Sequence, residues 1–390
     1  MTKLAERMNR LGTETAFEVL ARAKALAAQG RHIIHLEIGE PDFDTPANVI
    51  DAGIRALRSG QTHYGPAPGL PQLREAVARY VARTRRTQVS AEQVLVTPGG
   101  KPVMFYLMLA LLQQGDEAVY PNPGFPIYES MIRYTGARPV PARLHPENDF
   151  RLDFREVRKI VNDKTRLLIT NSPGNPCGNA MTRADTEAVV ELLHEHKNLH
   201  VLSDEIYSRL LYEGEHSSPL SYPEVSDRVI VLDGFSKTYA MTGWRLGYGV
   251  MHRDLVKACA QLQVNCASCT ASFTQLAGVE ALEGPQDAVE HMCAEFRRRR
   301  DYLIAELNRI PGFRCVRPHG AFYAFPEIRG TGLSSAEVQN RLLNEAGVAT
   351  LSGTAFGEHG EGFLRLSYAN SMDNLKLAVE RIRAAFPGQG

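Results

Sequence analysis

The chain has 390 residues, 44% of them apolar and 23% charged, an ordinary composition for a globular protein with a large core. Lys plus Arg and Asp plus Glu both number 44, so no net charge favours nucleic acid or an anionic membrane as a partner. No apolar run approaches the roughly 20 residues that a membrane-spanning helix needs. The length suggests two or three domain-sized units.

The six cysteines are too sparse for a disulfide framework in a chain of this size. Cys266 and Cys269 have CxxC spacing, but neither a second pair nor a nearby histidine completes a metal site. Residues 1–14 lack the apolar core of a signal peptide. We therefore expect reduced thiols, no metal and a cytoplasmic location.

The N-terminal quarter of the chain predicts helices separated by turn-rich loops. Apolar residues recur at helical spacing over residues 17–27, 48–58 and 73–84. In the loop Ile38–Pro46, Gly39 allows the backbone to approach a bound molecule closely, although a simple connector has the same composition. Tyr64 begins a second rigid loop and, taken alone, is an ordinary packed aromatic residue.

From residue 94 the chain alternates apolar strands with helical patterns, which predicts parallel βαβ units. Strands are expected over residues 94–96, 117–120, 166–170, 200–203 and 229–232. Four of them are followed by glycine-rich or polar residues. Because ligands of open α/β sheets bind at the carboxyl ends of the strands, we expect four features to converge there: Gly99–Gly100, Asn175, Asp204 and Lys237.

Each of these features has a chemical interpretation and a plainer structural alternative. The pair Gly99–Gly100 leaves backbone N–H groups free to hold a phosphate at a helix N-terminus, or forms a simple turn. Asp204 is costly to bury without a cation, unless it caps a helix. Lys237, between Ser236 and Arg245, can form a Schiff base with an aldehyde while its neighbours hold a phosphate; otherwise it is a solvated loop lysine.

Beyond residue 290 the pattern changes to short strands at 313–316, 321–326, 348–351 and 363–367, with a helix over 335–346. We predict three parts: an N-terminal segment (1–45) that joins the small domain, a large domain (46–290) and a small C-terminal α+β domain (291–390). The basic run Arg297–Arg300 is flanked by acidic residues and is expected to form a solvated helix face.

Arg365 lies inside an otherwise apolar strand, where a guanidinium requires an anionic partner. A carboxylate that accepts from two guanidinium nitrogens is the natural partner. A structural salt bridge is the alternative.

The segment Ser236–Gly247, SKTYAMTGWRLG, resembles the lysine segment of class I aminotransferases, enzymes of fold type I that use pyridoxal 5′-phosphate (PLP). Similar motifs follow in that family's order from Gly39 to Arg365. The resemblance implies an α/β fold with a mostly parallel central sheet, helices on both faces and a smaller α+β domain. It also implies a homodimer with shared active sites.

The resemblance implies that Lys237 carries PLP and serves as general base and then acid. It pairs Asp204 with the protonated ring nitrogen, which makes the ring a better electron sink. Phe125 would stack on the ring, where many relatives have tryptophan. Asn175 and Tyr207 would contact the phenolic oxygen.

The same resemblance implies that the phosphate is bound by Ser236, Arg245 and the Gly99–Gly100 backbone, with Tyr64 contributed by the partner subunit. It also implies that the substrate α-carboxylate is bound by Arg365, Asn175 and Gly39. Lys101 matches a position that, in one branch of aspartate aminotransferases, is linked to the distal carboxylate of the substrate. It could instead face the phosphate or solvent.

The predicted activity is ping-pong transfer of an amino group from an L-amino acid to a 2-oxo acid, with acidic substrates favoured. The alternative is a PLP-dependent lyase or another carbanion enzyme on this fold. A PLP-sensing transcription regulator would need a DNA-binding domain, and only 38 residues precede Gly39. A scaffold without cofactor would have no reason to keep Lys237, Asp204 and Arg365 together.

Overall fold

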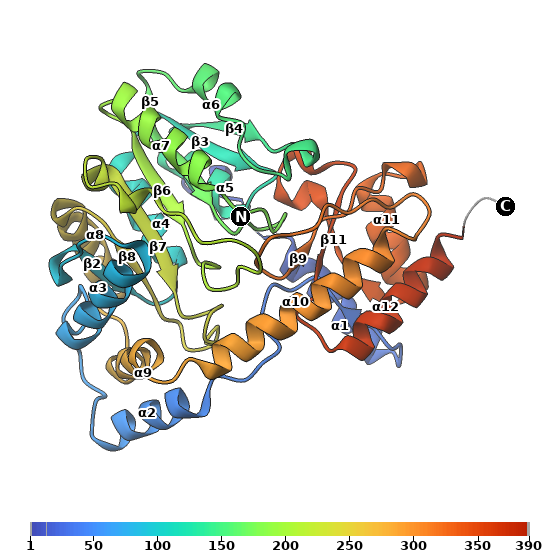
Figure 1. Ribbon diagram of the computed structural model, residues 1–390, viewed down its shortest axis with the longest axis horizontal. Helices are drawn as coiled ribbons and strands as arrows, with labels where there is room; N and C mark the ends of the chain where they lie inside the picture. Colours follow the sequence, from blue (N-terminus) through green and yellow to red (C-terminus); the bar gives the residue numbers. More distant parts are fainter. Residues whose placement is uncertain (1, 13, 388–390) are drawn as a thin grey trace.

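The computed structural model describes residues 2–12 and 14–387 and is built around a seven-stranded sheet (Figure 1). Across the sheet the order is β2-β8-β7-β6-β5-β3-β4, and only β8 runs antiparallel to its neighbours. The strands are β2 (Val94–Thr97), β3 (Glu117–Asn122), β4 (Arg138–Arg143), β5 (Thr165–Asn171), β6 (His200–Asp204), β7 (Val229–Gly234) and β8 (Gly247–Val250). The expected α/β fold with a mostly parallel sheet is confirmed.

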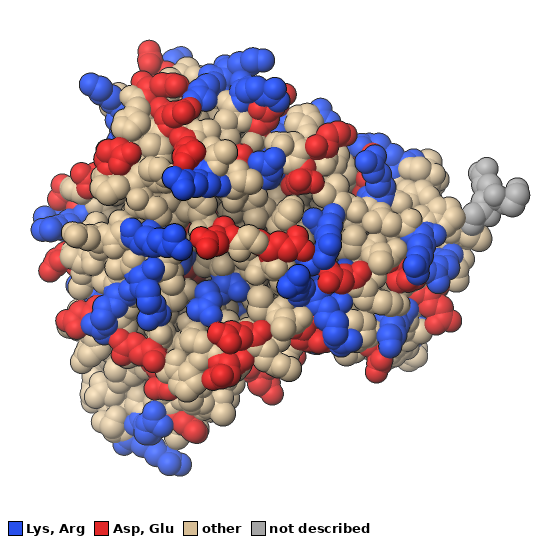
Figure 2. All heavy atoms as spheres, viewed as in Figure 1, with Lys and Arg blue, Asp and Glu red and all other residues tan. Residues whose placement is uncertain are grey.

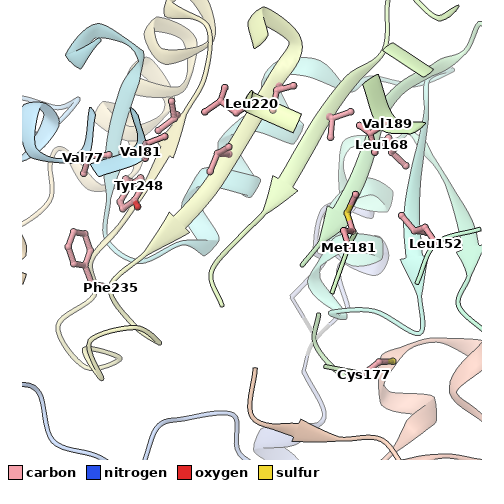
Figure 3. Close-up of a cluster of buried hydrophobic side chains, with 14 of the residues drawn as sticks. Val77, Val81, Leu152, Leu168, Cys177, Met181, Val189, Leu220, Phe235 and Tyr248 are labelled. Carbon is pink, nitrogen blue, oxygen red and sulfur yellow. The ribbon is translucent and has the colours of Figure 1, made fainter. Parts of the chain in front are cut away.

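The inner strands are apolar on both faces because helices cover both faces of the sheet. Successive residues of a strand point to opposite faces. Val231 of β7 therefore packs in one core with Val77 of α3 (Pro71–Arg85), whereas Ile230 packs in another with Leu107 of α4 (Lys101–Leu111). Figure 3 shows the first core, in which side chains from β5, α3 and α7 lie along one face of the sheet.

The other helices around this sheet are α2 (Ala47–Arg58), α5 (Ile127–Thr135), α6 (Phe154–Ile160), α7 (Arg183–Glu195), α8 (Arg253–Ala267) and α9 (Ser272–Glu283). The sequence predicts α7, whose N-terminus is stabilised by a capping box between Thr182 and Asp185. It does not predict β4, which contains Pro139 and Pro141. Proline is tolerated there because β4 is an edge strand that pairs only with β3.

The long helix α10 (Asp287–Leu307) leads from the large sheet to a second group of elements (Figure 1). This group contains α11 (Ser335–Arg341), α12 (Met372–Ala385) and a three-stranded sheet of order β11-β12-β9: Leu351–Ser352, Leu364–Ser367 and Tyr323–Ala324. The N-terminal strand β1 (Ile34–His35), which follows α1 (Ala16–Ala28), pairs in parallel with β10 (Val348–Ala349). The domain boundaries at residues 45 and 290 stay a prediction.

Three sequence-based expectations about this C-terminal part are wrong. Residues 313–316 form no strand, because only Arg314 bridges to Glu327. The expected strand at 348–351 is divided between β10 and β11, which belong to different sheets. In the basic run, Arg299 and Arg300 are buried: Arg299 pairs with Asp42 at 2.7 Å, and Arg300 donates to the Pro318 carbonyl at 2.8 Å.

Basic and acidic side chains are interspersed over the face shown in Figure 2. Within residues 2–12 and 14–387, no helix is long and apolar enough to cross a membrane. The same residues contain no group of three or more His, Cys, Asp or Glu side chains arranged to hold a metal ion. The six cysteines are free thiols.

Candidate active site

A cavity of about 360 Å³ lies at the carboxyl edge of the seven-stranded sheet. It is lined by eleven of the residues singled out from the sequence, namely Gly39, Gly100, Lys101, Phe125, Asn175, Asp204, Tyr207, Ser236, Lys237, Arg245 and Arg365. Gly99 lies against Arg245, since a Cβ atom at residue 99 would meet its guanidinium at 2.3 Å. Tyr64 is 90% exposed and does not line this cavity. The expected convergence of the strand ends is confirmed.

Lys237 follows β7 and is half-buried, with Nζ donating a hydrogen bond to the Gly39 carbonyl at 2.6 Å. Burial lowers the pKa of Lys237 to about 8; the charge of Glu40 opposes this, and nearby cations including Arg365 add to it. A substantial fraction of the amine is therefore neutral near pH 8, the form in which it acts as a nucleophile or base.

Asp204 ends β6 and is buried, with Oδ2 accepting from the Tyr128 hydroxyl at 2.6 Å and Oδ1 from the Ile206 amide at 3.2 Å. Burial raises the pKa of Asp204 to about 6, against the effect of the Tyr128 hydrogen bond. Among the described residues, no Lys, Arg or His side chain forms an ion pair with this carboxylate. It is therefore suited to a cation that a bound molecule brings into the cavity.

The cavity wall near β2 has the properties of an anion site. Helix α4 begins after Gly100 with no side-chain cap; Pro102 has no N–H and the Val103 amide donates to the Gly100 carbonyl at 3.1 Å, so the amides of Gly100 and Lys101 remain for an anion, which the helix dipole also favours. The Gly99 amide is not free, because it donates to the Thr97 carbonyl at 2.8 Å. Arg245 holds its guanidinium beside Gly99, with Nη1 donating to the Thr242 carbonyl at 2.8 Å. The buried Ser236 adds a hydroxyl to the same cavity. Backbone amides, a hydroxyl and a guanidinium together suit a phosphate.

Arg365 lies in β12 and is buried on the opposite side of the cavity. Nη1 donates to Asn175 Oδ1 at 3.1 Å, Nη2 donates to the Glu37 carbonyl, and Nε has no partner among the described residues. Burial lowers the pKa of Arg365, while nearby negative groups oppose the change. Its partners in the protein are neutral oxygen atoms, so the guanidinium can still receive a carboxylate.

Two tyrosines near this arginine complete this side of the cavity. The hydroxyls of Tyr207 and Tyr323 are 2.7 Å apart, and the Arg365 guanidinium lies 4.6 Å from the centre of the Tyr323 ring. A Cβ atom at Gly39 would lie 2.2 Å from the Tyr323 hydroxyl, so only glycine fits at residue 39 without displacing this side chain. The absence of a side chain at residue 39 is therefore a requirement of the cavity.

Sequence reasoning missed Tyr128, Tyr323 and Glu14, which also line the cavity. Tyr128 follows Phe125 by three residues at the start of α5, and this helical spacing was a usable signal. Tyr323 stands in a strand between two phenylalanines and looks like a core residue. Glu14 precedes α1 and forms an ion pair with Lys101, a contact between segments 87 residues apart that local patterns do not reveal.

Comparison with known proteins places these features in a family. Residues 31–382 match the model for aminotransferase class I and II. The aspartate aminotransferase of Pyrococcus horikoshii is 37% identical over 388 residues, covering 99% of this chain and 98% of the relative. Arginine–pyruvate transaminase AruH of Pseudomonas aeruginosa is 40% identical over 371 residues, covering 94% and 93%. The structure of Thermus thermophilus aspartate aminotransferase with maleate has a TM-score of 0.94 at 38% identity, covering 99% and 100%.

The fold and the cavity define an α/β protein whose polar and charged groups meet at the carboxyl edge of its central sheet. The chain belongs to the class I and II aminotransferases. It is therefore an enzyme that transfers amino groups, as the lysine segment and the order of the motifs predict.

Proposed function

We propose that this aminotransferase uses PLP and moves the amino group of an L-amino acid to a 2-oxo acid in a ping-pong cycle. The observation that carries the proposal is the meeting, in one cavity, of the Lys237 amine, the unpaired Asp204 carboxylate and the anion site of Gly100 and Arg245. These groups match the aldehyde, the ring nitrogen and the phosphate of PLP, respectively.

The residues present fit the cofactor. Lys237 would bind the aldehyde carbon and Asp204 the protonated ring nitrogen. The phosphate would be held by Ser236, Arg245 and the Gly100 backbone. Phe125 offers its ring for stacking, and Asn175 and Tyr207 offer polar groups for the phenolic oxygen. When bound, PLP supplies an electron sink for the negative charge that develops at the substrate Cα.

The side chains that act on the substrate divide between binding and proton transfer. Arg365 and Asn175, with the Gly39 backbone, bind and orient the α-carboxylate. The Lys237 amine, once free, removes the proton from the substrate Cα and later returns a proton from the same Nζ atom, because its lowered pKa allows both forms near neutral pH. Asp204 remains ionised when a cation faces it and stabilises the charge on that cation.

Acidic amino acids are the first substrates to test. The Pyrococcus horikoshii relative is named an aspartate aminotransferase, and Lys101 supplies a cation in the cavity wall. The relative named arginine–pyruvate transaminase makes a basic donor the second choice. We propose that Lys101 faces the distal end of the substrate.

We also propose a homodimer in the cytoplasm. Tyr64 is exposed in the single chain, and a partner subunit's cavity would give its hydroxyl a phosphate to contact. Sedimentation of the purified protein would test the assembly. Tyr64→Phe should weaken PLP binding if the hydroxyl contacts the phosphate, and unchanged PLP affinity would contradict that role.

A panel of amino donors and 2-oxo acids, assayed for both oxo-acid formation and ammonia release, tests the proposed reaction. Transamination without ammonia is expected, and release of ammonia in step with donor consumption would favour a lyase. Arg365→Ala should raise KM for amino and oxo acids far more than it changes PLP content. Equal affinity of the wild-type enzyme for an amino acid and its decarboxylated amine would contradict the role of Arg365.

A further inference from the structure

An ion pair between Lys101 and Glu14 lies in the wall of the cavity. Lys101 is the first residue of α4, and Glu14 belongs to the segment that precedes α1. The Lys101 side chain is 47% exposed and the Glu14 side chain 19%. Lys101 Nζ also lies 5.5 Å from the centre of the Phe125 ring, so the pair stands beside the proposed cofactor site.

Glu14 acts on Arg365 as well as on Lys101. Glu14 and Arg365 both line a small cleft beside Phe125 and Phe356. Burial lowers the pKa of Arg365, and the negative charge of Glu14 is one of those that oppose this change. One carboxylate of the protein therefore lies within electrostatic reach of both cations that face the substrate.

None of the functions proposed for the other charged residues of the cavity involves Glu14. The proposed cofactor would use Lys237, Asp204 and Arg245, and Arg365 would bind the α-carboxylate. What faces the distal end of a substrate is then the pair Lys101–Glu14 together with the acidic residue Glu40. A second substrate carboxylate can bind Lys101 only by displacing Glu14 or by lying close to it, where like charges repel.

We propose that Glu14 is a specificity-determining residue that competes with the distal carboxylate of dicarboxylic substrates for Lys101. Monocarboxylic substrates leave the ion pair in place, and substrates with a basic distal group gain an attraction to Glu14. The inference rests on the proposed function, because it assigns the distal end of the substrate to this wall. It differs from a free lysine site, in which dicarboxylates meet no competitor.

The test compares Glu14→Gln with the wild-type holoenzyme. Removal of the competing charge should raise kcat/KM for L-aspartate or L-glutamate by about twofold to fivefold, the size of one partly exposed charge interaction. The value for L-alanine should change by a smaller factor, because Glu14 acts on Arg365 only at longer range, and the value for L-arginine should fall. Glu18→Gln, at an exposed position of α1, is the matched control and should change none of the three.

A binding measurement separates this inference from the proposed reaction. In calorimetric titrations of the PLP-loaded protein, Glu14→Gln should bind succinate about twofold to fivefold more tightly, and the change in propionate affinity should be smaller. An unchanged ratio of the two affinities, or an equal change for both acids, would overturn the role of Glu14. If no donor is transaminated, the proposed function fails, whereas the succinate-to-propionate ratio still decides the role of Glu14.

Discussion

Asp204 and Glu205 are consecutive buried carboxylates at the end of β6, yet their surroundings differ in every electrostatic respect. Glu205 accepts hydrogen bonds from Arg85 at 2.8 Å and from Ser218 at 2.6 Å, and its Oε2 lies 2.9 Å from His216 Nε2. Burial alone would raise the pKa of Glu205, but the charges of Arg85 and His216 lower it to about 2. Among the residues that the structure describes, Asp204 has two hydrogen-bond donors and no cationic partner, and burial raises its pKa to about 6.

The difference follows from the alternation of side chains along a strand. Asp204 faces the cavity, as does Leu232, its partner on β7, whereas Glu205 and Asp233 face α3 and share Arg85. On the face of the sheet that α3 covers, the buried carboxylates are paired with a cation. On the face that lines the cavity, Asp204 keeps a buried negative charge that is costly until a cation binds beside it. This asymmetry separates a structural ion network from a binding site.

The largest expected effect comes from removing the amine on the cavity face. Lys237→Ala should abolish the visible absorption band of the proposed cofactor together with transamination, because the only other lysine that lines the cavity among the described residues is Lys101, whose amine pairs with Glu14. Absorbance spectra and a transamination assay check both. Lys257→Ala, on an exposed face of α8, is the matched control. An unchanged spectrum in the Lys237 variant would contradict the assignment.

The next prediction sets the neighbouring carboxylates against each other. Asp204→Asn should lower kcat by about 1,000-fold, because it removes the charge that stabilises a protonated ring. Glu205→Gln makes the same chemical change on the other face and should leave kcat of the folded enzyme close to wild type. Steady-state kinetics at measured cofactor content decides. Equal losses in the two variants would show that the faces are not functionally separate.

Arg85→Met tests the ion network on the α3 face of the sheet. It leaves Glu205 and Asp233 buried without their shared cation, so we expect a loss of about 3–5 kcal/mol in the free energy of unfolding. Urea denaturation of the cofactor-free protein measures it. Arg86→Met removes the neighbouring arginine, whose pair with Glu215 is largely exposed, and should change stability by about 0.5 kcal/mol or less. Similar losses in both variants would refute the idea of a complete ion network.

The smallest effect is the pH dependence of the cofactor-free protein. Because the pKa of Asp204 is raised from 3.8 to about 6 on folding, the native state holds this proton more tightly than the unfolded chain does. Asp204 thus adds to the free energy of unfolding below about pH 4, and this stabilisation is lost as the pH rises through about 6. Asp204→Asn should therefore stabilise the cofactor-free protein at pH 7 by about 3 kcal/mol, with little change at pH 4. Urea unfolding at the two pH values checks the sign.

The sequence predicts the residues that line the cavity better than it predicts the ion network on the α3 face of the sheet. Asp204, Lys237 and the glycines each follow an apolar strand. A parallel sheet places the carboxyl ends of its strands along one edge, whatever the order of the strands across the sheet. The role of Arg85 could not be predicted, because a lone arginine in a helical pattern looks like a surface residue until α3 packs on the sheet. Its two carboxylate partners are 120 and 148 residues away in the chain.

The fold shows the same division between local and distant information. The inner strands of the large sheet are recognisable because they are apolar throughout. The strands of the C-terminal part have only two to four residues, and their boundaries depend on partners that local patterns do not identify. The expected strand at 313–316 fails for this reason. Arg299 and Arg300 depart from the expected solvated face because Asp42 and the Pro318 carbonyl reach them from other segments.

The pairing of the first strand with late elements has a consequence for how the enzyme is made. The Ser367 amide donates to the Leu36 carbonyl at 2.8 Å, and Arg365 reaches the backbone of Glu37 across 328 residues of chain. All seven strands of the large sheet have left the ribosome once residue 250 and a tunnel's length beyond it have been synthesised. Arg365, the proposed receptor for the substrate carboxylate, must wait for β12, so the nascent protein completes the sheet that carries the proposed cofactor site before it completes the proposed carboxylate site.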